Sequence, residues 1–179
     1  MDRYVLVDRD GVINHDSDDY IKSEEEWRPI EGSLEAIALL NQHGCKVAVI
    51  TNQSGLQRGL FDQATLDKIH AKMRRLAAEK GGEIDCIYFC PHGPDDGCAC
   101  RKPKPGLLEL FAADKQVSLR GMPFIGDALR DIQTAQAVGA SPILVKTGKG
   151  QKTLMDNPDL NIPVFDNLYD AAKYLTSRQ

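Results

Sequence analysis

Short runs of apolar, often β-branched residues recur along the chain and alternate with segments in which apolar residues are three or four positions apart. Runs this apolar are typical of strands buried on both faces of a parallel sheet. Five such strands are expected, at residues 4–7, 46–50, 84–89, 122–125 and 142–145. Because helical segments separate them, the pattern predicts an α/β fold, a three-layer, Rossmann-like parallel sheet with right-handed crossovers.

Residues that commonly cap helices bound several of the segments between these strands. Ser33 is expected to cap a helix that ends at Gly44, and Asp62 to cap a longer helix that ends at Gly81. Pro105 is suited to the first turn of another helix, because its ring fixes a helical φ angle. Two further helices are expected, at residues 127–138 and 168–175.

Length and composition indicate one folded unit. The chain has 179 residues, of which 42% are hydrophobic and 27% charged, values typical of a folded protein rather than a disordered one. A single domain over residues 1–179 is therefore predicted. The longest apolar runs are too short to span a bilayer and the first residues lack the apolar core of a signal peptide, so we expect a cytoplasmic protein without a membrane partner.

The charge balance bears on possible partners. A formal net charge of −4 argues against a general nucleic-acid binder, which usually carries a basic surface. An anionic small molecule stays possible, because a binding site needs only a few local cations. Nothing in the sequence indicates an obligate protein partner, and a monomer is expected.

Oxygen-bearing side chains follow three of the expected strands. Asp8 and Asp10 follow the first strand, Thr51 and Asn52 the second, and Asp127 the fourth. The carboxyl ends of parallel strands lie at one edge of the sheet, where ligands bind. Neighbouring carboxylates repel one another and favour a cation or a shared proton, and an all-oxygen set suits Mg²⁺. Each aspartate alone would as readily be a turn or cap residue, but their convergence favours a metal site.

Three cysteines and a histidine crowd into residues 90–100. In a cytosolic chain such a cluster favours a metal over disulfides, and a Cys98–Cys100 disulfide would be strained. Three sulfurs and one nitrogen suit the closed tetrahedral shell of structural Zn²⁺, which would hold a loop that has no side chains for a core. The alternative is a polar loop with incidental cysteines. The expected zinc ligands are Cys90, His92, Cys98 and Cys100.

Four short motifs, in this order, resemble the signature of haloacid dehalogenase (HAD) superfamily phosphatases. They are Asp8-Arg9-Asp10-Gly11-Val12-Ile13, Thr51-Asn52, Lys102-Pro103, and Gly126-Asp127 with Asp131. The resemblance implies an HAD-like fold and a Mg²⁺-dependent phosphoric monoester hydrolase. Asp8 would be the nucleophile that forms an aspartyl-phosphate, and Asp10 would protonate the leaving alcohol and then accept a proton from water.

The same resemblance implies roles for the remaining motif residues. Mg²⁺ would be held by the carboxylates of Asp8 and Asp127 and the backbone carbonyl of Asp10. Thr51 and Lys102 would bind the oxygens of the transferred phosphoryl group, where negative charge must be stabilised. Asp131 would orient Lys102 or a metal-bound water.

Residues of the cysteine loop and the stretch after it narrow the resemblance. Cys90-Pro91-His92 followed by Cys98-Ala99-Cys100-Arg101-Lys102-Pro103 is shared by histidinol-phosphatases and heptose-bisphosphate phosphatases. Residues 51–55, 58–59 and 145–150 are more similar to the second group. The resemblance to the second group implies that the substrate is a small phosphorylated sugar, D-glycero-D-manno-heptose 1,7-bisphosphate, and that its C7 phosphate is removed. The product, heptose 1-phosphate, would serve the synthesis of ADP-heptose (lipopolysaccharide core) or a related nucleotide-heptose.

Substrate contacts are expected around the phosphate site. Arg101 would bind the phosphate that is retained, because its planar guanidinium matches phosphate geometry. Neither residues 14–33 nor residues 51–85 are expected to hold a separate cap domain, so the cleft would be open. A histidinol-phosphatase is the alternative substrate class, and a zinc-stabilised binding module is the non-enzymatic alternative. The expected substrate-binding residues are Asp16, Asp18, Asp19, Tyr20, Asn52, Gln53, Ser54 and Arg101.

Overall fold

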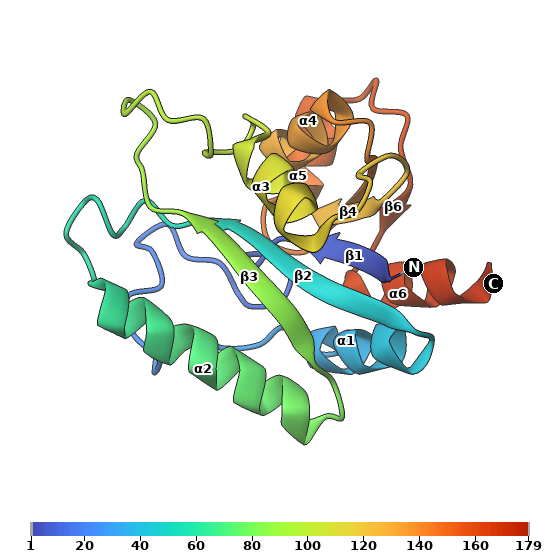
Figure 1. Ribbon diagram of the computed structural model, residues 1–179, viewed down its shortest axis with the longest axis horizontal. Coiled ribbons are helices and arrows are strands. Elements are labelled where there is room, and N and C mark those ends of the chain that lie inside the picture. The colour runs from blue at the N-terminus through green and yellow to red at the C-terminus, as the bar shows by residue number, and fades with distance from the viewer. Residues whose placement is uncertain (1, 179) are drawn as a thin grey trace.

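The computed structural model describes residues 2–178 and confirms the parallel α/β sheet (Figure 1). All strand pairs are parallel, in the order β3-β2-β1-β4-β5-β6. The strand order reverses between β1 and β4, which is where open α/β sheets bind ligands. The strands are β1 (Arg3–Val7), β2 (Cys45–Asn52), β3 (Ile84–Cys90), β4 (Pro123–Gly126), β5 (Ser141–Val145) and β6 (Val164–Phe165).

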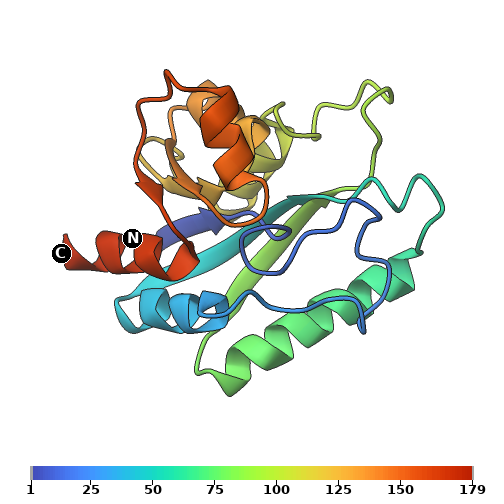
Figure 2. The same ribbon diagram turned by 180° about the vertical axis from the view of Figure 1, so that it is seen from behind.

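Helices cover both faces of the sheet (Figures 1 and 2). On one face lie α1 (Ser33–Gln42), α2 (Gln63–Glu79) and α6 (Leu168–Ser177), and on the other lie α3 (Gly106–Lys115) and α4 (Leu129–Ala137). Because side chains alternate along a strand, Val5 and Val7 of β1 pack against the first layer and Leu6 against the second. These three residues are nearly or completely buried, so β1 forms the centre of two apolar cores.

The ends of the helices match some of the predicted caps. Asp62 accepts a hydrogen bond from the backbone N–H of Thr65, as expected of an N-cap. The prediction that Ser33 caps α1 was wrong: the cap residue is Gly32, in a left-handed conformation at φ 83°. Ser33 is instead the first helical residue, and its buried hydroxyl donates to the carbonyl of Val12. The capping group is thus used to fix the loop after β1 against α1.

Two elements near the C-terminus were not predicted. The helix α5 (Gly150–Asp156) and the two-residue strand β6 are too short to give a clear periodic pattern. Thr153 of α5 donates its buried hydroxyl to the backbone carbonyl of Asp127, which ties this helix to the end of β4.

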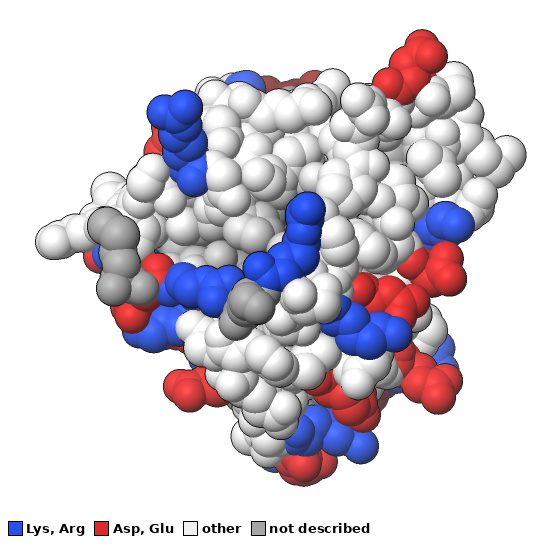
Figure 3. Space-filling view, turned by 90° about the vertical axis from the view of Figure 1, so that its right-hand side faces the viewer, with Lys and Arg blue, Asp and Glu red and all other residues white. Residues whose placement is uncertain are grey.

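The connections after β1 and β2 leave the carboxyl edge of the sheet open. Between β1 and α1 the chain forms turns and isolated bridges, and between β2 and β3 its one helix is α2, so neither connection holds a separate folded cap. Among residues 2–178, none of the helices has the length and apolar character that crossing a bilayer requires. On the face seen in Figure 3, basic and acidic side chains are intermingled rather than gathered into a patch of one sign.

Candidate active site

Three buried aspartates meet at the carboxyl edge of the sheet. Asp8 follows β1, Asp127 follows β4, and Asp131 lies in the first turn of α4. Each offers a carboxylate oxygen within 4.8 Å of the others. The approach of Asp127 requires a glycine at position 11, because a Cβ there would lie 2.1 Å from the Asp127 Oδ2 atom. The strand ends therefore converge as predicted, with Asp131 added to the group.

The ammonium group of Lys102 lies among these carboxylates. Its Nζ atom donates to Asp8 Oδ1 at 3.0 Å, to Asp131 Oδ1 at 2.7 Å and to the backbone carbonyl of Ile50 at 2.9 Å. Lys102 is 1% exposed. Burial alone would lower the pKa of Lys102, but the charges of Asp131 and Asp8 outweigh it and raise that pKa, so the ammonium stays charged.

Both carboxylate oxygens of Asp131 have partners within the protein. Oδ1 accepts from Lys102, and Oδ2 accepts from the backbone N–H of Ala128 at 3.1 Å. Asp131 can approach so closely because position 126 is glycine, where a Cβ would lie 2.4 Å from the Cβ of Asp131. Of the two roles left open for Asp131, this geometry favours that of orienting Lys102.

The buried carboxylates outnumber the buried ammonium group, which makes this a suitable site for a cation. Burial and then the Asp131 charge raise the pKa of Asp8 well above its usual range. The same two causes, in the same order, raise the pKa of Asp127 to about 6. A hard divalent cation would relieve this repulsion, and oxygen donors are the ligands that Mg²⁺ prefers. The donor set therefore fits Mg²⁺.

Asp10 is held mainly through one of its two oxygens. Oδ1 accepts from Arg9 Nη2 at 2.8 Å, from Arg9 Nε at 3.0 Å and from Asn14 Nδ2 at 3.0 Å. Oδ2 accepts from Gln53 Nε2 at 3.1 Å. Burial alone would raise the pKa of Asp10, but the charge of Arg9 and the hydrogen bonds from Asn14, Arg9 and Gln53 lower it overall. Asp10 lines the open cleft described below.

The two residues at the end of β2 have different surroundings. Thr51 is 1% exposed, and its hydroxyl accepts from Gln53 Nε2 at 3.0 Å. The side-chain amide of Asn52 pairs with the backbone of Lys102: Oδ1 accepts from Lys102 N–H at 3.1 Å, and Nδ2 donates to its carbonyl at 3.2 Å. Asn52 therefore fixes the segment that carries the motif lysine beside β2.

A cleft of about 250 Å³ lies above this group, between the loop after β1 and the loop after β3. Asp19 lies elsewhere, lining a neighbouring hollow with Lys22, Glu25 and Glu26. Its proposed contact with substrate stays a prediction from sequence. The predicted substrate residues that the structure gathers around the cleft are Asp16, Asp18, Tyr20, Asn52, Gln53, Ser54 and Arg101.

Two cations in the cleft were not found from the sequence. Arg130 lines the cleft, and its Nε atom is buried without a hydrogen-bond partner among residues 2–178. Burial would lower the pKa of Arg130, but the charges of Asp131, Asp8, Asp127 and Asp16 raise it. Lys149 lines the same cleft, and its backbone N–H donates to Asp127 Oδ2 at 2.9 Å. The sequence offered one signal for Arg130: it is a cationic residue directly before the motif residue Asp131.

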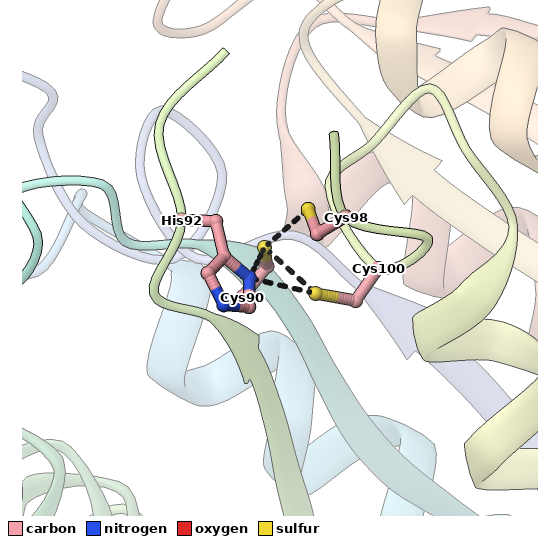
Figure 4. A group of neighbouring side chains, drawn as sticks. All are labelled: Cys90, His92, Cys98 and Cys100. Atoms are coloured by element: carbon pink, nitrogen blue, oxygen red, sulfur yellow. Dashed lines mark hydrogen bonds between the residues drawn. The ribbon is translucent and has the colours of Figure 1, made fainter. Parts of the chain in front are cut away.

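The predicted zinc ligands lie together in the structure (Figure 4). The Cys90 and Cys98 sulfurs are 3.7 Å apart, and His92 Nδ1 is 3.5 Å from Cys90 Sγ and 3.3 Å from Cys100 Sγ. A tetrahedral zinc with normal bond lengths places sulfur atoms about 3.8 Å apart. The Cys90–Cys98 pair has this spacing, whereas the Cys90 and Cys100 sulfurs lie closer together, at 2.9 Å. All five cysteines are free thiols, so no disulfide competes for these ligands. The donor set fits a structural Zn²⁺ ion.

The cysteine–histidine cluster is connected to the cleft. Arg101, directly after the last cysteine, donates from Nη1 to the backbone carbonyl of His92 at 3.2 Å. Lys102 is the next residue and enters the buried carboxylate group. The loop that carries the cluster therefore leads directly into Arg101 and Lys102, two cationic side chains of the site.

A parallel sheet with acidic motifs and a buried lysine at its carboxyl edge defines the class of HAD-like hydrolases. The HAD-hydrolase-like family model matches residues 99–171. The chain is 53% identical to D-glycero-beta-D-manno-heptose-1,7-bisphosphate 7-phosphatase from Pseudomonas putida, over 97% of this chain and 99% of the relative. Identity to the enzyme of the same name from Pseudomonas aeruginosa is also 53%, over 98% and 99% of the two chains.

A solved structure shows the same similarity. The D,D-heptose 1,7-bisphosphate phosphatase from B. bronchiseptica, complexed with magnesium and phosphate, superposes with a TM-score of 0.96. It is 50% identical in sequence, and the match covers 99% of each chain. The chain belongs to the family of D-glycero-beta-D-manno-heptose-1,7-bisphosphate 7-phosphatases.

Proposed function

We propose that this protein hydrolyses the C7 phosphate of D-glycero-beta-D-manno-heptose 1,7-bisphosphate and leaves the C1 phosphate in place. The observation that carries this proposal is the identity of 53% over 97% of the chain to a phosphatase of that name, combined with a site able to perform the chemistry. The product, a heptose 1-phosphate, suits synthesis of nucleotide-activated heptose. A cytoplasmic location and a monomeric state stay predictions from sequence.

The residues of the site divide the reaction into two steps. An oxygen of Asp8 attacks phosphorus, and the bond between phosphorus and the C7 oxygen breaks while Asp10 donates a proton to that oxygen. Water then attacks the aspartyl-phosphate, Asp10 accepts its proton, and inorganic phosphate leaves. We assign Lys102, whose Nζ lies 3.0 Å from Asp8 Oδ1, and the Thr51 hydroxyl to the phosphoryl oxygens, where negative charge would develop.

Asp8, Asp127 and the backbone carbonyl of Asp10 would hold Mg²⁺. When bound, this ion offsets the repulsion between the nucleophile's carboxylate and the phosphate dianion. Asp131 is assigned to Lys102, because its Oδ1 accepts from the ammonium group while its Oδ2 accepts from the backbone N–H of Ala128.

Comparison of two substrates tests the proposed specificity. We expect kcat/KM for the heptose bisphosphate to exceed that for histidinol phosphate on the order of 100-fold or more. Histidinol phosphate has no second phosphate to pair with the cations of the cleft, and it carries a cationic amine instead. The measurement is phosphate release by the same enzyme preparation on both substrates with Mg²⁺. A preference for histidinol phosphate would replace this proposal by the alternative substrate class.

Arg101 and Arg130 are the proposed partners of the phosphate that is retained. Both line the cleft, and Arg130 has a buried donor without a partner among the described residues. A guanidinium group donates in a planar fork that matches phosphate oxygens. The position beside Asp127 is Ala128, which has no charge to offer, so Arg130 supplies the cation on this side of the cleft.

Substitution of Arg130 by glutamine is expected to weaken binding of the bisphosphate selectively. Losing a hydrogen-bonded charge pair should raise KM for the bisphosphate about 10-fold or more. KM for the heptose 7-monophosphate should change little, because it lacks the second phosphate. The exposed Arg120 provides a matched control, and Arg120→Gln should leave both KM values unchanged. Equal changes for both substrates in Arg130→Gln would show that Arg130 does not bind the second phosphate.

Zinc is proposed as a structural ion of the loop after β3, with Cys90, His92, Cys98 and Cys100 as ligands. The support is the approach of their four donor atoms within 4.8 Å of one another. The backbone N–H groups of Arg101 and Cys100 outweigh the effect of burial and lower the pKa of Cys98 to about 6, which favours the thiolate that a metal needs. Zinc would hold the loop, and hydrolysis would not use it.

Elemental analysis tests the zinc site. We expect about one zinc per chain in purified protein, and loss of this zinc in Cys100→Ser, because the serine hydroxyl is a poor zinc ligand. Activity should fall with zinc content, since Arg101 and Lys102 follow the last ligand directly. Cys86 lies on β3 outside the cluster, so Cys86→Ser should retain zinc and serves as the control. Protein that contains no zinc but is fully active would reject the proposal.

A further inference from the structure

Arg9 is a fully buried cation between the two catalytic-motif aspartates. Its exposed fraction is 0%. The Nε and Nη2 atoms donate to the same oxygen of Asp10, Oδ1, at 3.0 and 2.8 Å. A guanidinium group has five N–H donors and no acceptor, so the third nitrogen, Nη1, also needs a partner in the interior.

That partner is His70, from the middle of α2. Arg9 Nη1 lies 3.1 Å from His70 Nε2, and the two residues are 61 positions apart in sequence. Because arginine can only donate, Nε2 must be the acceptor, and the ring is neutral with its proton on Nδ1. Burial and then the positive charge of Arg9 lower the pKa of His70 to about 3, in agreement with a neutral ring.

The connection from His70 through Arg9 ends on one oxygen of the proposed general acid. Asn14 donates to the same oxygen, so Oδ1 of Asp10 accepts three hydrogen bonds and cannot carry a proton. Oδ2 accepts from Gln53 alone among the described hydrogen bonds. A proton on Asp10 is therefore confined to Oδ2, because a rotation that exchanged the two oxygens of the protonated group would turn its O–H toward the N–H donors of Arg9 and Asn14.

We infer that His70 is a positioning residue for the general acid: it fixes the Arg9 guanidinium, which in turn holds Asp10 with Oδ2 available to the leaving oxygen. This inference rests on the proposed role of Asp10 in the phosphatase reaction. No motif in the sequence connects His70 with Arg9. Through the contact between His70 and Arg9, a residue of α2 that is 61 positions away in sequence helps to position the acid of the first catalytic step.

A positioning role predicts dependence on the leaving group. A sugar alcohol must be protonated as it leaves, whereas p-nitrophenolate leaves without protonation. A misplaced acid should therefore slow the first substrate more than the second. The parameter to compare is kcat/KM, which includes the steps up to departure of the leaving group but not hydrolysis of the aspartyl-phosphate.

The experiment compares kcat/KM for the heptose bisphosphate and for p-nitrophenyl phosphate in each variant and reports their ratio. The ratio cancels the folded fraction of a preparation, so partial unfolding does not obscure it. His70→Leu removes the acceptor for Arg9, and His70→Met is a second variant for the case that leucine prevents folding. His70→Gln places an amide oxygen near the position of Nε2. His43, exposed after α1, provides the control His43→Leu.

We expect the ratio to fall about 10-fold in His70→Leu, to return to within about threefold of wild type in His70→Gln, and to stay unchanged in His43→Leu. Asp10→Asn is the reference and should lower the ratio further. An unchanged ratio in both His70→Leu and His70→Met, with a lowered ratio in Asp10→Asn, would overturn this inference alone. An unchanged ratio in Asp10→Asn would instead reject the proposed acid, and the inference with it.

Discussion

Asp8→Asn is expected to abolish turnover while leaving the protein folded. An amide cannot act as the nucleophile that forms the aspartyl-phosphate, so kcat should fall on the order of 10⁴-fold or more. The fold should tolerate the change, because the asparagine oxygen can still accept from Lys102, which lies 3.0 Å from Asp8 Oδ1. The substitution also removes one of three buried carboxylates that repel one another.

Two measurements check this expectation. Phosphate release from the heptose bisphosphate gives kcat, and thermal unfolding gives the stability, which should be equal to or above that of wild type. Acid quenching during turnover of a ³²P-labelled substrate should trap label on wild-type protein and none on the variant. Normal turnover by folded Asp8→Asn would exclude Asp8 as the nucleophile. Inactive wild-type protein that binds zinc would favour the non-enzymatic binding module.

Lys102→Met is expected to affect both activity and stability. Removing the ammonium leaves Asp8 and Asp131 buried without their partner at 3.0 and 2.7 Å, and breaking a buried ion pair in this way costs about 3–5 kcal/mol of unfolding free energy. The transferred phosphoryl group also loses its cation, so kcat should fall on the order of 100-fold or more. Urea unfolding and phosphate release measure the two effects.

The stability loss in Lys102→Met should depend on pH. The pKa of Asp8 is already raised by burial and by Asp131, and removal of the Lys102 charge raises it further. A carboxyl group whose pKa is higher in the folded than in the unfolded state makes the protein less stable as pH rises above the unfolded value. The deficit relative to wild type should therefore be largest near neutral pH and shrink on acidification.

Lys104 provides the matched control for Lys102. It lies two positions further along the same loop, is exposed, and donates from Nζ to the backbone carbonyl of Cys98. Lys104→Met should change stability and kcat little. In the double variant Lys102→Met/Asp131→Asn, part of the lost stability should return without activity. A fully stable and active Lys102→Met protein would contradict the account of this buried ion group.

The sequence predicted the positions of functional residues where these directly follow a strand or lie close together in the chain. Asp8, Thr51 and Asp127 stand where buried strands end, and parallel strands bring such positions to one edge whatever the details of packing. The cluster of Cys90, His92, Cys98 and Cys100 was predictable because these residues are close in sequence, so a short loop brings them together. Apolar runs also located five of the strands, since a central parallel strand is buried on both faces.

The partnerships of buried side chains were not predictable from the sequence. The contact of His70 with Arg9 spans 61 positions, and no local pattern encodes it. Arg130 gave a signal only as a cation beside Asp131. Ser33 has the chemistry of an N-cap, yet its hydroxyl bonds to Val12 because a tertiary contact took precedence over the local one. Such choices depend on the packing of α1 and α2 against the sheet.

The central claim, removal of one defined phosphate by this site, is tested most directly by ³¹P NMR. Wild-type protein with Mg²⁺ is added to D-glycero-beta-D-manno-heptose 1,7-bisphosphate, and both phosphate resonances are followed with time. We predict that the C7 resonance disappears as inorganic phosphate appears in equal amount, while the C1 resonance persists as heptose 1-phosphate. Loss of the C1 phosphate, or two unchanged resonances with folded, metal-loaded protein, would contradict the account.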